Sequence, residues 1–284
     1  MAPAKKKFVL AASAGILALC SVLLLAALLW GPLQPLSPWV MGFQHRDTDS
    51  ARVYFHQGTD LGMFDGIDAL VAGVEKTHAM TFPMRAEIFV CGSDAEYWRL
   101  VRTGARFCVY PKYGRLYVSA RALRDAGAGT IHLDTYLTHE LSHSLLYQNM
   151  PLARFIGFPD WLLEGLAVLN ADQRGVDGYL TRDQVRAKMR EGYFLHPSDF
   201  TTKPWHRAGV LKRFPLTDKY WFIYSELACF VEDLVQTGGQ TRFSTFERGL
   251  IDGKDEKTLF QTVYGRSLND QVTGFRKRMT GSGP

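Results

Sequence analysis

Two histidines four residues apart, with a glutamate directly after the first, stand in the segment His139-Glu140-Leu141-Ser142-His143. On an α-helix, residues i and i+4 share one face with their Cβ atoms about 5–6 Å apart. His139 and His143 can therefore direct ring nitrogens at one Zn²⁺ ion. Glu140 is rotated by roughly 100° around the helix, so its carboxylate faces a metal-bound water rather than the metal. The spacing predicts a zinc site with a general base beside it.

A third protein ligand is needed, because catalytic zinc usually takes three and keeps one position for water. The segment Pro-Asp-Trp-Leu-Leu-Glu-Gly-Leu-Ala at 159–167 offers Glu164. A carboxylate in so apolar a run is costly to bury unless a cation binds it. His139, His143 and Glu164 are therefore predicted to hold one Zn²⁺ per chain, with Glu140 as the catalytic base.

Two helices must carry these residues. The first has leucines four residues apart at positions 137, 141 and 145, and Pro151 supplies its stop. Asp134 is predicted to be the N-cap of this helix, and Asp160 is predicted to cap the second, which carries Glu164.

Short strand-like runs alternate with helical spacing between residues 51 and 120. A capping box of Ser93 and Glu96 opens one of the helices. After about residue 120 the pattern is almost wholly helical. We predict an α+β fold, in which a small α/β part with a mixed sheet (51–130) precedes a helical half (131–280). The predicted strands are 53–56, 86–91, 107–110 and 115–119. We expect the last, at 116–119, to receive an extended peptide by edge pairing.

The N-terminus contains an uncharged apolar stretch from Phe8 to Trp30, directly preceded by three lysines. This length spans a bilayer core, and the lysines favour a cytoplasmic N-terminus. A cleavable signal peptide is the alternative, but its apolar region would be about 7–15 residues and would end in small residues. We therefore predict a cytoplasmic tail (1–7), an uncleaved single-pass anchor (8–30) and a proline-containing linker (31–50). The domain would then lie on the extracytoplasmic side.

Charge and cysteine content narrow the function classes. The formal charge is +5, but residues 1–30 hold three lysines and no acid, which leaves 30 basic and 28 acidic groups in the rest. Such a balance gives no reason to expect nucleic-acid binding. On the extracytoplasmic side disulfides persist, and a Cys91–Cys108 bridge is predicted, which would contribute about 3 kcal/mol. Cys229 stands in an apolar helical stretch and is predicted to be a buried free thiol.

The two metal motifs, with Glu164 following 21 residues after His143, resemble those of the gluzincin metallopeptidases. That group includes the thermolysin-like and M1 aminopeptidase-like enzymes and, most similar here, the bacterial peptidase MA-like domains. The segments Tyr224-Ser225-Glu226 and 263–268 also resemble the part that closes MA-like domains. The resemblance implies zinc bound by two histidines and the later glutamate, with the glutamate inside the motif as base.

A later tyrosine or histidine often stabilises the developing oxyanion in gluzincins. The resemblance matches this role to Tyr224, with Tyr220 and His206 as its rivals. The chain also departs from two patterns in the group. Val168 stands where thermolysin-like enzymes place an acid that orients a histidine, and Leu163 stands where aminopeptidases have asparagine. Aminopeptidase specificity is therefore not expected.

Three functions remain open from the sequence. The first is a peptidase acting on peptides or proteins outside the cytoplasmic membrane. The second is a membrane-tethered binding or assembly factor that keeps the fold without cleaving. The third is hydrolysis of a non-peptide amide. Retention of Glu140 favours the first, because a purely structural zinc site needs no base and is usually closed by four ligands.

Overall fold

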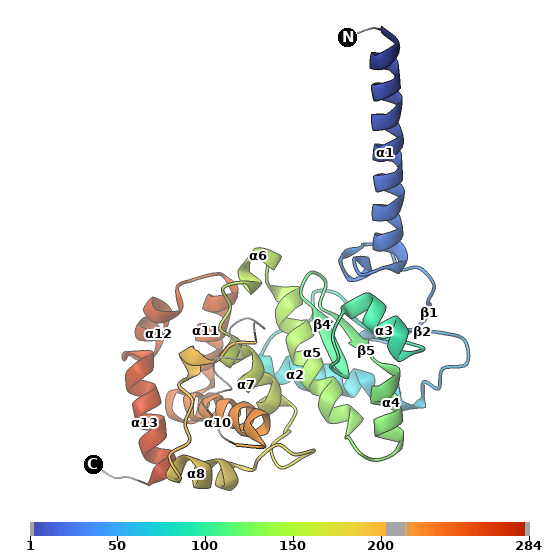
Figure 1. Ribbon diagram of the computed structural model, residues 1–284. Coiled ribbons are helices and arrows are strands. Elements are labelled where there is room, and N and C mark those ends of the chain that lie inside the picture. The colour runs from blue at the N-terminus through green and yellow to red at the C-terminus, as the bar shows by residue number, and fades with distance from the viewer. Residues whose placement is uncertain (1–2, 203–213, 215, 282–284) are drawn as a thin grey trace.

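One mixed sheet gathers the strands of the first half of the chain. The computed structural model describes residues 3–202, 214 and 216–281 (Figure 1). The strand order is β1-β2-β3-β5-β4, with β1 and β4 antiparallel to their neighbours and β2, β3 and β5 parallel. Their bounds are β1 (Gln44–Asp47), β2 (Ala51–Phe55), β3 (Ala86–Val90), β4 (Phe107–Tyr110) and β5 (Arg115–Val118).

Both faces of the sheet are apolar, since helices cover each of them. Val53, Ile88 and Val118 lie in one core, which also contains the apolar residues of α2 (Ile67–His78) and α5 (Leu133–Asn149). On the other face Tyr54, Phe89 and Tyr117 stack in a row, with ring centroids 4.4 and 4.7 Å apart, beneath α3 (Asp94–Val101). These β-branched and aromatic residues explain why the segments form strands, because such side chains fit a buried pleated surface.

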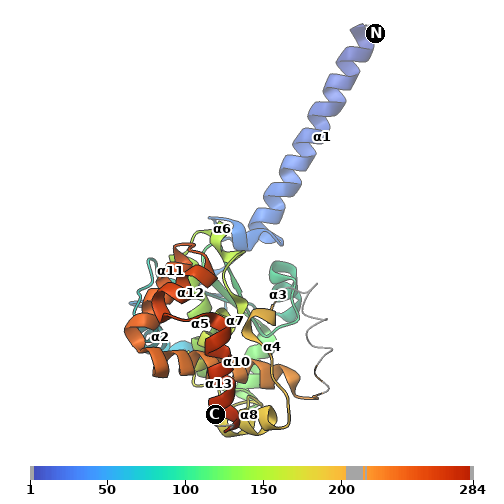
Figure 2. The ribbon, with the colours of Figure 1, turned by 90° about the vertical axis from the view of Figure 1, so that its left-hand side faces the viewer.

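Every described element after β5 is helical. The helices α5 and α7 lie between the sheet and a group of C-terminal helices (Figures 1 and 2). The elements not yet given are α1 (Pro3–Trp30), α4 (Ala120–Gly127), α6 (Leu152–Phe155), α7 (Asp160–Asn170), α8 (Arg182–Arg190), α10 (Lys219–Gly238), α11 (Gln240–Ile251), α12 (Glu256–Tyr264) and α13 (Leu268–Thr280), with short 3-10 turns η1 (Gln34–Leu36), η2 (Gly62–Phe64) and η3 (Pro197–Asp199).

The α+β class, the mixed sheet and the four predicted strands are confirmed, each strand to within two residues. The role given to 116–119 is wrong. This segment forms β5, which pairs on both sides with β3 and β4 and so has no free edge. Among the described strands, β4 forms the edge of the sheet on the side of β5. A run of alternating residues predicts a strand, but it does not reveal which neighbours that strand will have.

The segment predicted as a linker packs on the domain instead. Residues 44–47 pair with β2 as an edge strand. Gln34 and Ser37 are buried: the Tyr117 hydroxyl donates to Gln34 Oε1 at 2.7 Å, and Arg115 Nη1 donates to the Ser37 carbonyl at 2.6 Å. Prolines at 32, 35 and 38 suggest a spacer, but the polar groups between them are bound by the sheet. The chain that follows α1 is therefore docked rather than free.

The predicted Cys91–Cys108 bridge is wrong, since both thiols are free. Cys91 follows β3 and still pairs with β5, whereas Cys108 lies in β4 on the other side of β5. Two strand spacings of about 4.8 Å exceed the roughly 7 Å limit between Cα atoms that a disulfide can span. Burial raises the pKa of Cys108 to about 12, so its thiol stays protonated. Cys229 is buried and free, as predicted.

The helix α1 projects away from the rest of the molecule (Figures 1 and 2). Its part from Ala12 to Trp30 is long and apolar enough to cross a membrane, and none of it is buried against the protein. An N-terminal signal sequence can also form a helix of this length and composition. At its foot the Trp30 carbonyl accepts a hydrogen bond from Arg99 on α3, which fixes the end of α1 to the domain.

Candidate metal centre

Three donor atoms from two helices meet at one point. His139 and His143 lie on α5 and Glu164 lies on α7. The two Nε2 atoms are 3.1 Å apart, and Glu164 Oε2 lies 3.5 Å from that of His139 and 3.4 Å from that of His143. Tetrahedral ligands about 2.0–2.1 Å from a zinc ion are separated from one another by roughly 3.3 Å. The observed triangle fits that geometry, so this group can hold a metal ion.

The sequence placed both helices but not their first residues. The N-cap of α5 is His132 rather than Asp134, which lies in the first turn. Asp160 is the first residue of α7, after Pro159 as N-cap, and its carboxylate accepts hydrogen bonds from Thr201 Oγ1 and Thr202 N, both at 2.8 Å. An acid in the first turn still favours the helix through the macrodipole. The predicted stop holds, because α5 ends at Asn149, two residues before Pro151.

Each histidine presents its Nε2 atom to the site, and the second ring nitrogen differs between them. His139 Nδ1 lies 3.0 Å from Oε1 of Gln173, which is fully buried in the turn after α7. A hydrogen bond donated from Nδ1 to this oxygen leaves the lone pair of Nε2 free for a metal. His143 Nδ1 is buried without a partner among the described residues.

Gln173 is an orienting residue that sequence reasoning missed. In this chain Gln173, and not the apolar Val168, forms the hydrogen bond that orients the ring of His139. No helical spacing could reveal it, because it follows the end of α7 and returns to His139 through a turn.

The pKa values of the Glu140 and Glu164 carboxyl groups are shifted in opposite directions. Burial raises the pKa of Glu140 to about 7, and nearby Glu164 adds to the rise while His139 opposes it. Burial alone would also raise the pKa of Glu164, but His143 and His139 outweigh it and hold that pKa well below its usual range. Glu164 is therefore an anion suited to bind a cation. Glu140 is suited to exchange a proton near neutral pH.

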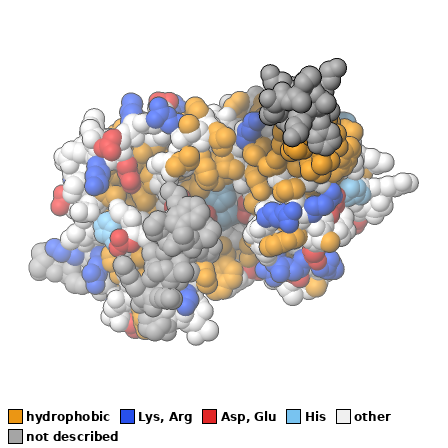
Figure 3. Space-filling model, turned by 45° about the horizontal axis from the view of Figure 1, so that its top comes forward, with side chains coloured by type: hydrophobic (Ala, Val, Ile, Leu, Met, Phe, Trp, Pro, Cys, Tyr) orange, Lys and Arg blue, Asp and Glu red, His pale blue; other side chains and the backbone are white. Residues whose placement is uncertain are grey.

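A cleft of about 720 Å³ opens over these residues. Figure 3 shows histidine side chains set back in a hollow between the strand-bearing side and the helical side of the molecule. One wall is the edge strand β4 with the residue before it, and the other includes three tyrosines. The residues that matter here are Arg106, Phe107, Cys108, Tyr179, Tyr220 and Tyr224.

Tyr224 and its rival Tyr220 both line this cleft, and His206 lies outside the described residues. Tyr224 is half-buried, with its ring edge-on to Phe200 at 5.6 Å and to Tyr179 at 6.5 Å. Tyr179, which is buried at the cleft wall, was not foreseen, because it stands in a loop with no periodic pattern around it.

The close packing around Gly165 explains why a glycine follows Glu164. A Cβ atom added there would lie 2.8 Å from the Leu227 carbonyl oxygen and 2.9 Å from Val231 Cγ2 on α10. Only glycine therefore lets α7 approach α10 this closely. The close packing fixes the rotation of α7, and with it the direction in which Glu164 points.

The two residues after Tyr224 face away from the cleft. Ser225 Oγ accepts a hydrogen bond from Leu180 N at 2.9 Å, and the Glu226 carboxylate accepts one from Leu195 N at 3.1 Å. Both side chains are buried and hold the loops that flank α8. Burial raises the pKa of Glu226 well above its usual value, with the Leu195 amide and Arg276 opposing the rise.

We expect the Glu226→Gln variant to become more stable than wild type as pH rises. A group whose pKa is raised by folding keeps its proton in the native state, so wild-type stability falls once pH exceeds the unfolded value of 4.5. The loss is about 1.4 kcal/mol per pH unit until the native pKa is reached. Glutamine does not titrate. The melting temperatures of wild type and Glu226→Gln should be equal near pH 4, and that of the variant should be higher at pH 8. A difference in melting temperature that does not change with pH would contradict this prediction.

Comparison with known proteins adds no assignment to this geometry. No model of a known protein family matches the chain, and no curated protein matches it significantly.

Proposed function

We propose that the chain is a membrane-anchored zinc metallopeptidase. The observation that carries the proposal is the triangle of His139, His143 and Glu164 donor atoms at the floor of a cleft, with the Glu140 carboxylate beside it. Three ligands leave one position for water, which is the arrangement of catalytic rather than structural zinc. The resemblance of both motifs to those of the gluzincins supports the same function.

Each of these residues would then have a separate role in peptide-bond hydrolysis. When bound, zinc supplies Lewis acidity, which polarises the scissile carbonyl and lowers the pKa of water. Glu140 accepts the proton of the attacking water and later delivers it to the leaving amine. Tyr224 is the proposed donor to the developing oxyanion, a role worth about 2.7–4 kcal/mol in other enzymes. Gln173 holds the ring of His139 in the orientation that directs Nε2 inward.

The edge strand β4 suits an extended peptide substrate. Among the described residues it pairs with β5 on one side only, and Phe107 and Cys108 in it line the cleft. Unpaired backbone groups along such an edge can hydrogen-bond a peptide in β conformation. A peptide held there would have its scissile bond close to His139, His143 and Glu164, so we propose for β4 the part first expected of residues 116–119.

The membrane part of the proposal rests on α1. Its apolar stretch is long enough for a bilayer core, and Lys5, Lys6 and Lys7 before it favour a cytoplasmic N-terminus. The domain would then work on the extracytoplasmic side. Because the chain after α1 is docked through Gln34 and Ser37, the domain would stand in a fixed orientation at the membrane surface.

Metal removal tests the function directly. The full chain in detergent is incubated with a mixed peptide library, and products are identified by mass spectrometry. We expect cleavage to cease after treatment with a zinc chelator and to return when zinc is added. Cleavage that persists in the fully zinc-depleted chain would refute the proposal. A zinc-bound chain inert on every peptide would favour the non-cleaving binding factor, and activity on non-peptide amides alone would favour the third function.

A further inference from the structure

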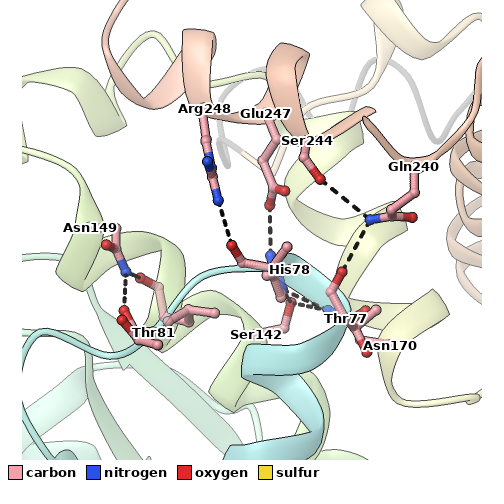
Figure 4. Close-up of polar contacts among 12 residues, drawn as sticks. Thr77, His78, Thr81, Ser142, Asn149, Asn170, Gln240, Ser244, Glu247 and Arg248 are labelled. Atoms are coloured by element: carbon pink, nitrogen blue, oxygen red, sulfur yellow. Dashed lines mark hydrogen bonds and ion pairs between the residues drawn. The ribbon is translucent and has the colours of Figure 1, made fainter. Parts of the chain in front are cut away.

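A second buried polar cluster lies behind the metal helix, away from the cleft. His78, at the end of α2, is fully buried, as are Ser142 on α5 and Glu247 on α11. His78 Nδ1 lies 2.6 Å from Glu247 Oε1, and His78 Nε2 lies 2.8 Å from Ser142 Oγ and 2.6 Å from Asn170 Nδ2 (Figure 4). Side chains from three other helices, α5, α7 and α11, thus converge on the imidazole ring that α2 provides.

The partners of His78 define the direction of each hydrogen bond. Its Nδ1–H donates to the Glu247 carboxylate, which leaves one lone pair on Nε2 that the Ser142 hydroxyl and the Asn170 amide share. Asn170 also donates to Ser142 Oγ at 3.1 Å. The serine, histidine and glutamate follow one another as in a hydrolytic triad. However, none of the three side chains is accessible to a substrate, which rules out a nucleophilic role for Ser142.

The cluster instead joins the two helices that carry the metal ligands. Ser142 directly precedes His143 on α5, and Asn170 is the last residue of α7, six residues after Glu164. One ring nitrogen of His78 contacts both of them. The separation of α5 and α7 is therefore fixed at a point one residue from a metal ligand.

We propose that His78, oriented by Glu247, is a positioning residue for the metal centre: its contacts with Ser142 and Asn170 set the spacing between the histidine pair and Glu164. This inference rests on the proposed zinc site. A His78 ring without its Glu247 bond would be free to turn, and the buried polar groups that it satisfies would lose their partner. Outer partners of metal ligands commonly change metal affinity by 10–100-fold, and we place this cluster at the lower end of that range.

The test measures metal affinity in the full chain, separately from its stability. Zinc is removed and returned in competition with a chelator, and Co²⁺ is added in a parallel sample to record its visible absorption. Ser142→Ala, which removes only the hydroxyl, and His78→Phe, which removes every hydrogen bond of the ring, should each bind zinc about tenfold more weakly or worse. Both should alter the cobalt spectrum. Glu247→Gln keeps an acceptor for Nδ1–H and should stay close to wild type.

A matched control comes from another buried carboxylate. Asp233 on α10 accepts hydrogen bonds from Arg278 at 2.6 Å and Gln271 at 3.0 Å, both on α13. Asp233→Asn should lower the melting temperature and leave the zinc affinity and cobalt spectrum unchanged. If Ser142→Ala also behaves in this way, the cluster is only structural and the inference fails, whether or not His78→Phe folds. A wild-type chain that binds neither ion would refute the metal site itself, and this inference with it.

Discussion

Glu140→Gln is expected to lower kcat/KM for peptide cleavage by at least about a thousandfold while zinc stays bound. Glutamine has nearly the same shape as glutamate but cannot accept the proton of the attacking water, and general acid–base catalysis contributes about 10²–10⁴-fold. Because Glu140 lies beside the donor triangle and is not one of its three members, the metal content should not change. Initial rates on a cleaved library peptide, with zinc measured in the same samples, check both statements.

Glu226→Gln is the control for this experiment. It makes the same chemical change at a carboxylate that is buried outside the cleft, and its kcat/KM should equal that of wild type. Equal activity of Glu140→Gln and wild type would remove Glu140 from the reaction. A large loss of zinc in Glu140→Gln would mean that the residue acts on the metal rather than on water.

Glu164→Ala is expected to reduce zinc from near one ion per chain to a small fraction of that. The substitution removes the only carboxylate of the triangle, and two imidazoles alone leave the coordination incomplete. We expect affinity to fall by more than about a hundredfold, beyond the 10–100-fold typical of partners outside the ligand set. Metal analysis after dialysis against a weak chelator measures the loss.

Two further variants should change the zinc affinity less than Glu164→Ala does. Gln173→Ala removes the acceptor of His139 Nδ1 and should weaken zinc binding by roughly 10–100-fold, less than Glu164→Ala. Glu232→Ala removes a carboxylate on α10 that is paired with Arg174 and Arg182 and does not line the cleft, and it should leave the zinc affinity unchanged. Unchanged zinc content in Glu164→Ala would exclude this residue from the site, and with it the three-ligand account.

Short-range sequence patterns were sufficient to predict those features of the structure whose physical cause is local. The helix that carries His139 and His143 follows from its four-residue spacing, and α5 ends two residues before Pro151. The strands follow from short apolar runs between turns. The three members of the proposed ligand set could be named because a carboxylate in an apolar helix calls for a partner, and the structure brings Glu164 within 3.5 Å of both rings. Naming these elements and residues did not require knowledge of how distant segments pack.

Features that depend on distant packing were missed or misplaced. The sequence did not show that β5 would lie between β3 and β4, which separates Cys91 from Cys108 and moves the free edge to β4. Nor did it show that residues 44–47 would join the sheet.

The polar partners of α5 were equally hidden, because Gln173 reaches His139 and His78 reaches Ser142 from other segments of the chain. The sequence by itself determined the two helices of the site, four of the five described strands and the candidate ligands, since these are set by neighbours within a few residues. Strand order, the docked segment after α1 and the network that orients the site were decided only by the tertiary structure, because buried polar groups and strand edges find their partners across the folded chain.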